Sequence, residues 1–343
     1  TDAYSAEYLI ESDIDARAEY NDNIFLTDLP HDSVTGIIIT PAIYGKIKEK
    51  KWESSLSARI RSHTYSDDTL DTNDQFYDLI GQYNAERNIF SLNYNYDFDS
   101  NLNSTSTDFG IAGRRVNRKI QSLTPQYTRL LSVRSALSLS YTYSDVDYLE
   151  AENTGFTPYI LESGSGSFIY DLTEKDKLTF SLQAVDYTSK NDLVTYQLFT
   201  SRIGVEHEFT ETLSVDFLAG LSRQNTTSLS TQCFDFFGDI ICQTQEVDFQ
   251  NRGFVLNAGI KQLLEKGEIT ARVSRDNVTN SFGGLDRVDQ LKFNYSEKIS
   301  SLWRYAIGAR IEDITSISSG TRTTDRDVLF FNSTVYYSIT EKW

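Results

Sequence analysis

The sequence predicts an all-β fold, a transmembrane antiparallel β-barrel of about sixteen strands with short periplasmic turns and long extracellular loops. Three observations lead to this prediction. Apolar and polar residues alternate with period two along most of the chain, as in strands whose two faces meet different surroundings. The connections between these strands are alternately short and long. Aromatic residues are abundant, with 21 Tyr, 20 Phe and 3 Trp, whereas only 4 Pro occur in 343 residues.

Apolar stretches are too short for a membrane-spanning helix. Ile37 to Ile39 is followed directly by Thr40 and Pro41, whereas a helical span needs about eighteen or more consecutive apolar residues. A helical membrane protein is therefore excluded. A low mean hydropathy remains compatible with a barrel, because only one face of each strand contacts lipid. The residues from Thr1 onward have no signal-peptide pattern, so if the protein is exported, we expect its leader to have been removed.

Each strand is predicted from its own alternation. Between Leu178 and Ala184, apolar residues occupy the even positions, and Thr179, Ser181 and Gln183 occupy the odd ones. One face suits lipid and the other suits water. Comparable segments begin near residues 8, 35, 52, 75, 88, 118, 135, 158, 177, 195, 212, 252, 267, 288, 302 and 326.

The connections give the barrel its sidedness, because outer-membrane barrels have short turns on the periplasmic side and longer loops outside. The predicted short turns are 49–51, 85–88, 131–134, 173–176, 210–212, 264–267 and 297–300. The predicted long connections are 64–74, 97–117, 144–157, 223–251, 275–287 and 313–325. An even number of strands places both ends of the given chain in the periplasm.

We expect one domain over residues 1–343, closed where the first and last strands meet. Residues 338–343 resemble the inner turns, so a further C-terminal hairpin beyond Trp343, with eighteen strands in all, is the alternative to sixteen. A soluble β-sandwich or propeller is the alternative fold. It is disfavoured because no second layer is indicated and because a sandwich does not require short and long connections to alternate.

The net charge and the cysteines restrict partners and compartment. A formal charge of −17 argues against a nucleic-acid partner, which would need a basic surface. Cys233 and Cys242 lie close together in the longest predicted outer loop, and in an oxidising compartment they could form a disulfide. Two free thiols are the alternative. A metal site is disfavoured because no His or further Cys lies nearby.

The segment Glu19–Thr27, EYNDNIFLT, resembles the opening of an outer-membrane β-barrel porin family (beta-barrel porin 2-like) often associated with exopolysaccharide biosynthesis and export. The resemblance implies a Gram-negative outer membrane, a role in transport across the cell envelope and periplasmic export components as partners. It brings no catalytic residues. In a purely structural interpretation, Asp22 and Asn23 turn the chain while Ile24 and Phe25 anchor the loop.

We find no pattern that indicates an enzyme or a cofactor. His31, His63 and His207 are widely separated, and the run Ser163–Ser167 lacks the nucleophile-elbow pattern. That run is better explained as small residues that give room inside the barrel or bend a strand. No phosphate-binding loop, zinc pattern or calcium-binding hand is present.

Acidic residues of one predicted outer loop form a second candidate. Asp67, Asp68, Asp71 and Asp74 could bind divalent cations that bridge lipopolysaccharide, because hard cations prefer carboxylate oxygens. A solvated loop is the favoured interpretation. Outer-membrane lipids and lipopolysaccharide are expected partners in either case.

The inward face is the expected place for transport, because a barrel of sixteen to eighteen strands leaves an aqueous lumen. Alternation directs two sets of charges inward. The basic candidates are Arg59, Arg61, His63, Lys261, Arg272, Lys292, Arg304 and Arg310, and the acidic candidates are Glu11, Asp13, Asp15 and Glu19. On closure the acidic first strand would lie toward the basic late strands and create a transverse field. The cations either guide an anionic solute or polysaccharide, or form internal salt bridges that stabilise the wall.

Two functions are compatible with these residues. The first is a non-enzymatic outer-membrane pore for small polar solutes, or the outer-membrane component of exopolysaccharide export. The second is a structural or surface-interaction barrel whose lumen is closed by its own loops.

Overall fold

The computed structural model describes residues 6–21, 24, 33–100, 115–149, 156–236, 239–280, 284–317 and 326–337. These residues form sixteen strands and one short 3-10 helix, η1 (Asp68–Leu70), and none of their helices could cross a membrane. The strands are β1 (Glu7–Asn21), β2 (Val34–Lys48), β3 (Trp52–Tyr65), β4 (Thr72–Asn84), β5 (Asn88–Ser100), β6 (Asn117–Ser132), β7 (Ser135–Leu149), β8 (Tyr159–Asp171), β9 (Asp176–Ser189), β10 (Val194–Glu208), β11 (Leu213–Phe236), β12 (Asp239–Leu263), β13 (Gly267–Thr279), β14 (Leu285–Lys298), β15 (Trp303–Ser316) and β16 (Arg326–Tyr337).

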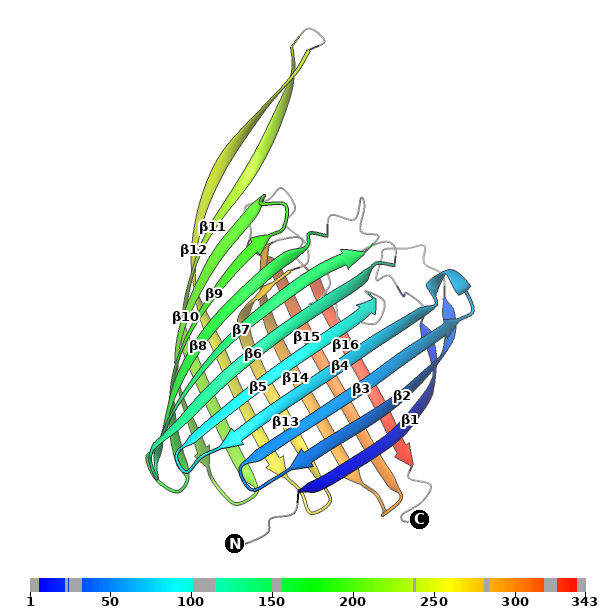
Figure 1. Ribbon diagram of the computed structural model, residues 1–343, viewed down its shortest axis with the longest axis vertical. Coiled ribbons are helices and arrows are strands. Elements are labelled where there is room, and N and C mark those ends of the chain that lie inside the picture. Colours follow the sequence, from blue (N-terminus) through cyan, green and yellow to red (C-terminus); the bar gives the residue numbers. More distant parts are fainter. Residues whose placement is uncertain are drawn as a thin grey trace.

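Each strand pairs antiparallel with its neighbours in sequence, so the sheet order is β1 to β16 without a crossover. Figure 1 shows the sheet curving into a barrel-shaped wall of tilted strands. The predicted fold class is confirmed, and fifteen strands begin within three residues of the expected position. All seven predicted short turns connect strands at one end of this wall. Backbone hydrogen bonds close them, as from Glu49 N to Trp52 O at 2.7 Å.

The first and last strands differ from expectation. Among the described residues, β1 pairs only with β2 and β16 only with β15, so the sheet keeps two free edges instead of a hydrogen-bonded closure. β1 is exposed along almost its whole length. Unpaired backbone groups at such edges are open to further strand pairing.

Two strands are much longer than predicted. β11 has 24 residues and β12 has 25, and they stay paired from Leu213–Gln262 to Phe236–Asp239. The expected long loop at 223–251 is therefore wrong: most of it is a two-stranded ribbon that rises beyond the other strands (Figure 1). Apolar alternation failed to predict it because a ribbon outside the membrane has no lipid-facing side to mark.

The cysteines lie in this ribbon, at directly opposed positions. The register pairs Cys233 with Cys242, and Cys242 is disulfide-bonded. The bond would fasten two strands that have no other neighbour at this height, because β10 pairs with β11 only as far as Ser228. Isolated two-stranded ribbons are marginally stable in water, so a covalent link here has a clear structural use.

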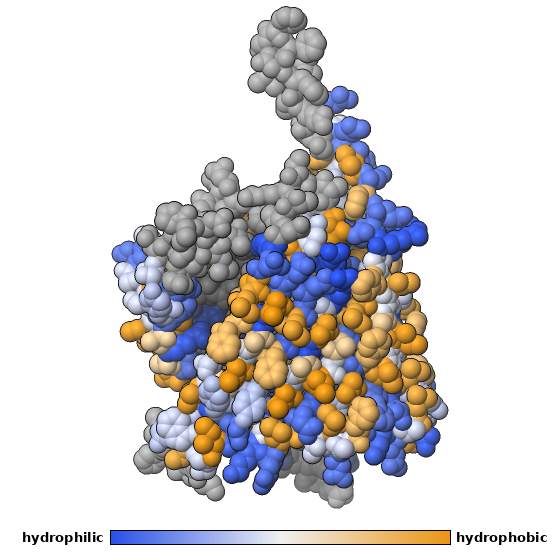
Figure 2. All heavy atoms as spheres, turned by 180° about the vertical axis from the view of Figure 1, so that it is seen from behind, coloured by the Kyte–Doolittle hydropathy of each residue, from blue (hydrophilic) through white to orange (hydrophobic). Residues whose placement is uncertain are grey.

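One face of the wall carries an apolar band. Leu221 is 69% exposed and Phe254 is 55% exposed, and many other large apolar side chains of the same face are exposed as well. On the side of the molecule that Figure 2 shows, apolar residues are concentrated in a belt across the middle of the wall, with polar residues mostly above and below. A belt of this kind matches the lipid-facing surface of a transmembrane barrel.

Candidate functional site

The inner face of the barrel is identified by contacts between strands that are not neighbours in the sheet. Arg202 Nη2 lies 2.5 Å from Asp276 Oδ1, which joins β10 to β13, and Arg272 Nη2 lies 2.9 Å from Asp216 Oδ1, which joins β13 to β11. Only side chains on the concave side of a curved sheet can meet in this way. Because directly paired residues share a face, the register extends this assignment around the wall.

The register places the predicted lumen candidates on this inner face. Those on β3 and β12 to β15 are Arg59, Arg61, His63, Lys261, Arg272, Lys292, Arg304 and Arg310. Those on β1 are Glu11, Asp13, Asp15 and Glu19. No ion pair within the described ranges joins this acidic set to the basic residues of the late strands, and β1 lies at a free edge.

Three of the cations form a row across neighbouring strands. Arg272 on β13 lies directly opposite Lys292 on β14, which lies directly opposite Arg310 on β15. Like charges at directly opposed positions destabilise a sheet. Two acids compensate the outer members: Arg272 Nη2 lies 2.9 Å from Asp216 Oδ1, and Arg310 Nε lies 3.2 Å from Glu312 Oε1.

Lys292 is the central member of this cationic row and differs from its neighbours. It forms no ion pair with any residue in the described part of the chain, and its side chain is exposed on the inner face. A cation flanked by two further cations and open to the lumen attracts anions. The row can therefore bind or guide a negatively charged solute.

The basic residues of β3 are more strongly engaged. Arg61 Nη2 lies 2.8 Å from Asp74 Oδ2, and His63 Nε2 lies 3.6 Å from the same oxygen. The guanidinium of Arg59 lies 4.5 Å from the centre of the Phe76 ring. Ion pairing and cation–π contact hold these side chains against the wall. On this side the structure favours stabilisation of the wall over solute guidance.

The acidic loop candidates do not form a cluster. Asp67 caps η1 by accepting from Thr69 N at 3.0 Å, and Asp71 accepts from Tyr65 N at 2.7 Å. Asp74 belongs to β4 and is buried beside Arg61. No group of ligating side chains suited to a metal ion occurs among the described residues.

The outer end of the inner face is packed with apolar and aromatic side chains. Tyr187 and Tyr196 are 0% and 1% exposed and stack with ring centroids 4.7 Å apart. Leu198 and Leu285 complete this cluster, which joins β9 and β10 to β14. We call these four residues the outer cluster. It lies on the side of the long connections and is buried, whereas Lys292, nearer the short turns, is exposed.

The outer cluster has a simple structural origin. β12 pairs with β13 only as far as Leu256 opposite Arg275, whereas β13 and β14 stay paired to Thr279 and Leu285. Beyond this point β12 follows the ribbon, and the end of β13 and β14 packs against the inner face of β9 and β10, where Thr279 meets Tyr196 and Leu285 joins the cluster. This cluster was not predicted from the sequence. Aromatic residues on the otherwise polar face of β9 and β10 were the available signal.

Polar contacts also occur at the outer turns. Lys190, which follows β9, lies 2.5 Å from Asp145 Oδ1 and 2.5 Å from Asp147 Oδ1. Burial opposes its charged form, but the two hydrogen bonds outweigh burial and raise the pKa of Lys190 above its ordinary value. This lysine stays charged in ordinary buffers and joins the β7 and β9 ends.

The other described residues that the sequence analysis singled out lie apart from the cationic row and from the outer cluster. In the run Ser163–Ser167, Ser165 faces inward and its Oγ lies 2.7 Å from Ser140 Oγ, whereas Gly164 and Gly166 face outward. The glycines thus make room on the outer surface, not inside the barrel.

The histidines and the family-like segment are only partly described. His207 Nδ1 lies 2.6 Å from Asp176 Oδ1, far in the sheet from His63 on β3, and His31 lies outside the described residues. Within Glu19–Thr27, Ile24 packs with Val34, as expected of an anchor, and residues 22, 23 and 25–27 lie outside the described ranges.

Comparisons with known proteins support the fold. No protein-family model matches the sequence, and no curated protein matches it significantly. A bacterial polysaccharide outer-membrane secretin is similar over 96% of this chain and 98% of its own, with 11% identity and a TM-score of 0.46. The copper transporter OprC is similar over 98% of this chain, with 9% identity and a TM-score of 0.51.

A third similar structure is the open form of the ferric-catecholate import receptor Fiu from E. coli K12, with 96% of this chain covered, 8% identity and a TM-score of 0.49. The chain spans 59% of the length of OprC and 62% of that of Fiu. These similar proteins are transporters, receptors and a secretin. The apolar belt, the alternating connections and the fold shared with OprC identify the chain as a β-barrel protein of the bacterial outer membrane.

Proposed function

We propose that the protein is a non-enzymatic pore that passes polar, negatively charged solutes across the outer membrane. The observation that carries this proposal is the cationic row of Arg272, Lys292 and Arg310 on the inner face. Its central lysine is exposed and has no ion-pair partner among the described residues. In a narrow, low-dielectric channel such a row raises the local concentration of anions.

The finer proposal is that the solute is an acidic polysaccharide and that the barrel is the outer-membrane component of an export system. It is supported by the resemblance of the Glu19–Thr27 segment to porins associated with exopolysaccharide export. A linear polyanion can engage neighbouring cations one after another, and the row offers three of them on consecutive strands. Periplasmic export components would then be its partners.

The second function is a barrel whose lumen is closed and which serves a structural or surface-interaction role. The outer cluster supports this alternative, because Tyr187, Tyr196, Leu198 and Leu285 pack across the inner face. A closed barrel would show no stepwise conductance in a planar bilayer. An open pore would show reproducible single-channel steps.

The test is ion selectivity measured from the reversal potential in a KCl gradient, with wild type compared with Lys292→Gln. Lys292 is the best position because its neutralisation leaves no carboxylate without its partner. We expect anion selectivity in the wild type and a shift toward cations in the variant, with single-channel conductance largely retained. An unchanged reversal potential would contradict solute guidance by the row.

The matched control is Arg129→Gln. Arg129 is exposed and lies on the outward face of β6, so this change removes the same charge from the other side of the wall. It should leave the reversal potential unchanged. An equal shift in both variants would mean that overall charge, and not the inner row, determines selectivity.

A further inference from the structure

The outward face of β11 and β12 carries two arginines at the edge of the apolar belt. Leu221 lies directly opposite Phe254, and the next outward pair along the same strands is Arg223 opposite Arg252. Both arginines are exposed. They lie on the side of the long connections, where the apolar surface gives way to polar side chains. In a transmembrane barrel this level faces the headgroups of the outer leaflet.

Within the part of the chain that the structure describes, no acid compensates the two arginines. No ion pair of Arg223 or Arg252 occurs within the described residues, and the polar neighbour of Arg223 is the neutral amide of Gln250, 3.0 Å from Nε when its oxygen faces the guanidinium. Directly opposed like charges destabilise a sheet. An anion between the two guanidinium groups would remove this repulsion, and phosphate is well suited because arginine binds it through two parallel hydrogen bonds.

A neighbouring arginine, Arg275, differs from this pair because it has an acidic partner. Arg275 lies opposite Leu256, at the same boundary of the apolar belt on β13. Its Nη2 lies 2.6 Å from Asp289 Oδ2, and its guanidinium lies 4.3 Å from the centre of the Phe254 ring. The boundary therefore does contain neutralised arginines. Arg223 and Arg252 have no such partner among the residues that the structure describes.

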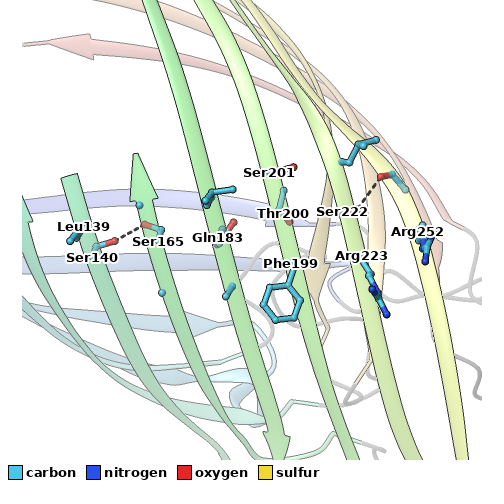
Figure 3. Close-up of a pocket in the computed structure, with 16 residues that line it drawn as sticks. Leu139, Ser140, Ser165, Gln183, Phe199, Thr200, Ser201, Ser222, Arg223 and Arg252 are labelled. Atoms are coloured by element: carbon cyan, nitrogen blue, oxygen red, sulfur yellow. Dashed lines mark hydrogen bonds between the residues drawn. The ribbon is translucent and has the colours of Figure 1, made fainter. Parts of the chain in front are cut away.

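An apolar groove of about 850 Å³ reaches this pair from the middle of the wall. Its floor lies at the outward-facing positions Gly164, Gly166 and Ala184, where two residues have no side chain and the third has only a methyl group, so the surface is hollow. Leu182 and Phe199 border it, and Figure 3 shows Phe199, Arg223 and Arg252 on consecutive strands at one end of the patch. A Cβ at Gly164 would meet nothing within 4 Å.

We propose that the groove and the arginine pair form a binding site for the lipid A part of lipopolysaccharide. An acyl chain would lie in the groove over Gly164 and Gly166, and a lipid A phosphate would bind between Arg223 and Arg252. The apolar floor requires a hydrocarbon chain, and the unpaired cations at its outer end require an anion. The site is independent of the lumen and of the proposed transport function.

The test is lipid A binding to the purified, folded protein in detergent, followed by native mass spectrometry. The double variant Arg223→Gln/Arg252→Gln should lower lipid A affinity about tenfold or more, since each phosphate contact by arginine is a charge-assisted hydrogen bond. Gly164→Leu keeps both arginines but fills the groove, and it should also weaken binding. Arg223→Lys/Arg252→Lys should retain part of the affinity, because lysine supplies charge without the bidentate geometry.

The matched control is Arg87→Gln/Arg134→Gln, which removes two exposed charges at the short-turn end. It should bind lipid A as the wild type does. Equal binding by wild type and the arginine double variant, or an equal loss in the control, would overturn the site. Dephosphorylated lipid A and inorganic phosphate serve as separate probes. If inorganic phosphate competes as well as lipid A does, the ligand is a soluble anion and the lipid assignment is wrong.

Discussion

Two sets of opposed cations occupy opposite faces of the same wall. On the inner face, Arg272, Lys292 and Arg310 form a row in which Asp216 and Glu312 compensate the two outer members. On the outward face, Arg223 and Arg252 form a pair that no acid within the described residues compensates.

We attribute the difference in compensation to the surroundings of the two faces, which are the lumen for the row and the lipid boundary for the pair. For the proposed transport function the row must attract a solute and release it again, so partial neutralisation by neighbouring acids would keep its binding weak. A pair at the lipid boundary lies next to a surface that already carries phosphate groups. There a phosphate group of the membrane can compensate the charge of the two arginines, and this phosphate does not need to be released.

Removing an acid from the inner row should have the largest effect on stability. Glu312 has a fully buried side chain beside Arg310, whose side chain is 21% exposed, and it also accepts from Gln290 Nε2 at 2.6 Å. In Glu312→Ala the arginine keeps its charge without a partner, which should lower the free energy of unfolding by about 3 kcal/mol. Urea-induced unfolding of protein folded into vesicles, followed by tryptophan fluorescence, measures this loss.

Glu268→Ala is the control for that variant. Glu268 pairs with Lys261 at 3.5 Å, and both side chains are about half exposed, so its removal should cost less than about 1 kcal/mol. If Glu312→Ala were as mild as Glu268→Ala, the inner row would not depend on its buried acid. The difference in charge compensation between the inner row and the outward pair would then have no effect on stability.

A charge reversal in the outward pair should have a smaller effect of opposite sign. Arg252→Glu would place a carboxylate directly opposite Arg223 and so imitate the compensation found inside. Cross-strand pairs contribute roughly 0.2–1 kcal/mol, and we expect a gain of about 0.5 kcal/mol in detergent free of lipid A. The midpoint of urea unfolding measures it.

The same variant should respond differently when lipid A is present. Wild type should gain stability on addition of lipid A, because a ligand that binds only the folded state raises the free energy of unfolding. Arg252→Glu should gain little. A destabilised variant in detergent alone would show that Arg223 and Arg252 do not repel each other at this distance.

Most of the wall could be predicted from the sequence because lipid imposes a strict period-two pattern on it. The alternation from Leu178 to Ala184 predicts β9 within one residue of its observed start, and the short turn at 49–51 lies where β2 ends. Where lipid is absent, the pattern fails. The ribbon formed by the ends of β11 and β12 rises beyond the other strands, where no lipid imposes alternation, so the pattern predicts a loop there instead of paired strands.

The site could be predicted less well, because alternation gives the face of a residue but not its partners. Alternation assigns Arg272 and Lys292 to one face, but their juxtaposition depends on the register between β13 and β14. The pair of Arg223 and Arg252 on the outward face could not be predicted from the sequence for a related reason. Arg223 and Arg252 end the predicted apolar stretches, so alternation marks them as boundaries of a loop rather than as opposed strand residues.

The smallest effect on the barrel is expected from the disulfide in the ribbon. Cys233 and Cys242 lie further out along the same two strands than Arg223 and Arg252, beyond the last pairing of β10 with β11. Cys242→Ser should therefore leave the unfolding midpoint of the barrel nearly unchanged, while limited proteolysis of intact cells should cut the ribbon sooner because its strands then separate more often. Lipid A binding should persist in this variant. A loss of binding would show that the ribbon holds the two arginines at their opposed positions. The outward site would then depend on the disulfide above it rather than on the boundary of the apolar belt.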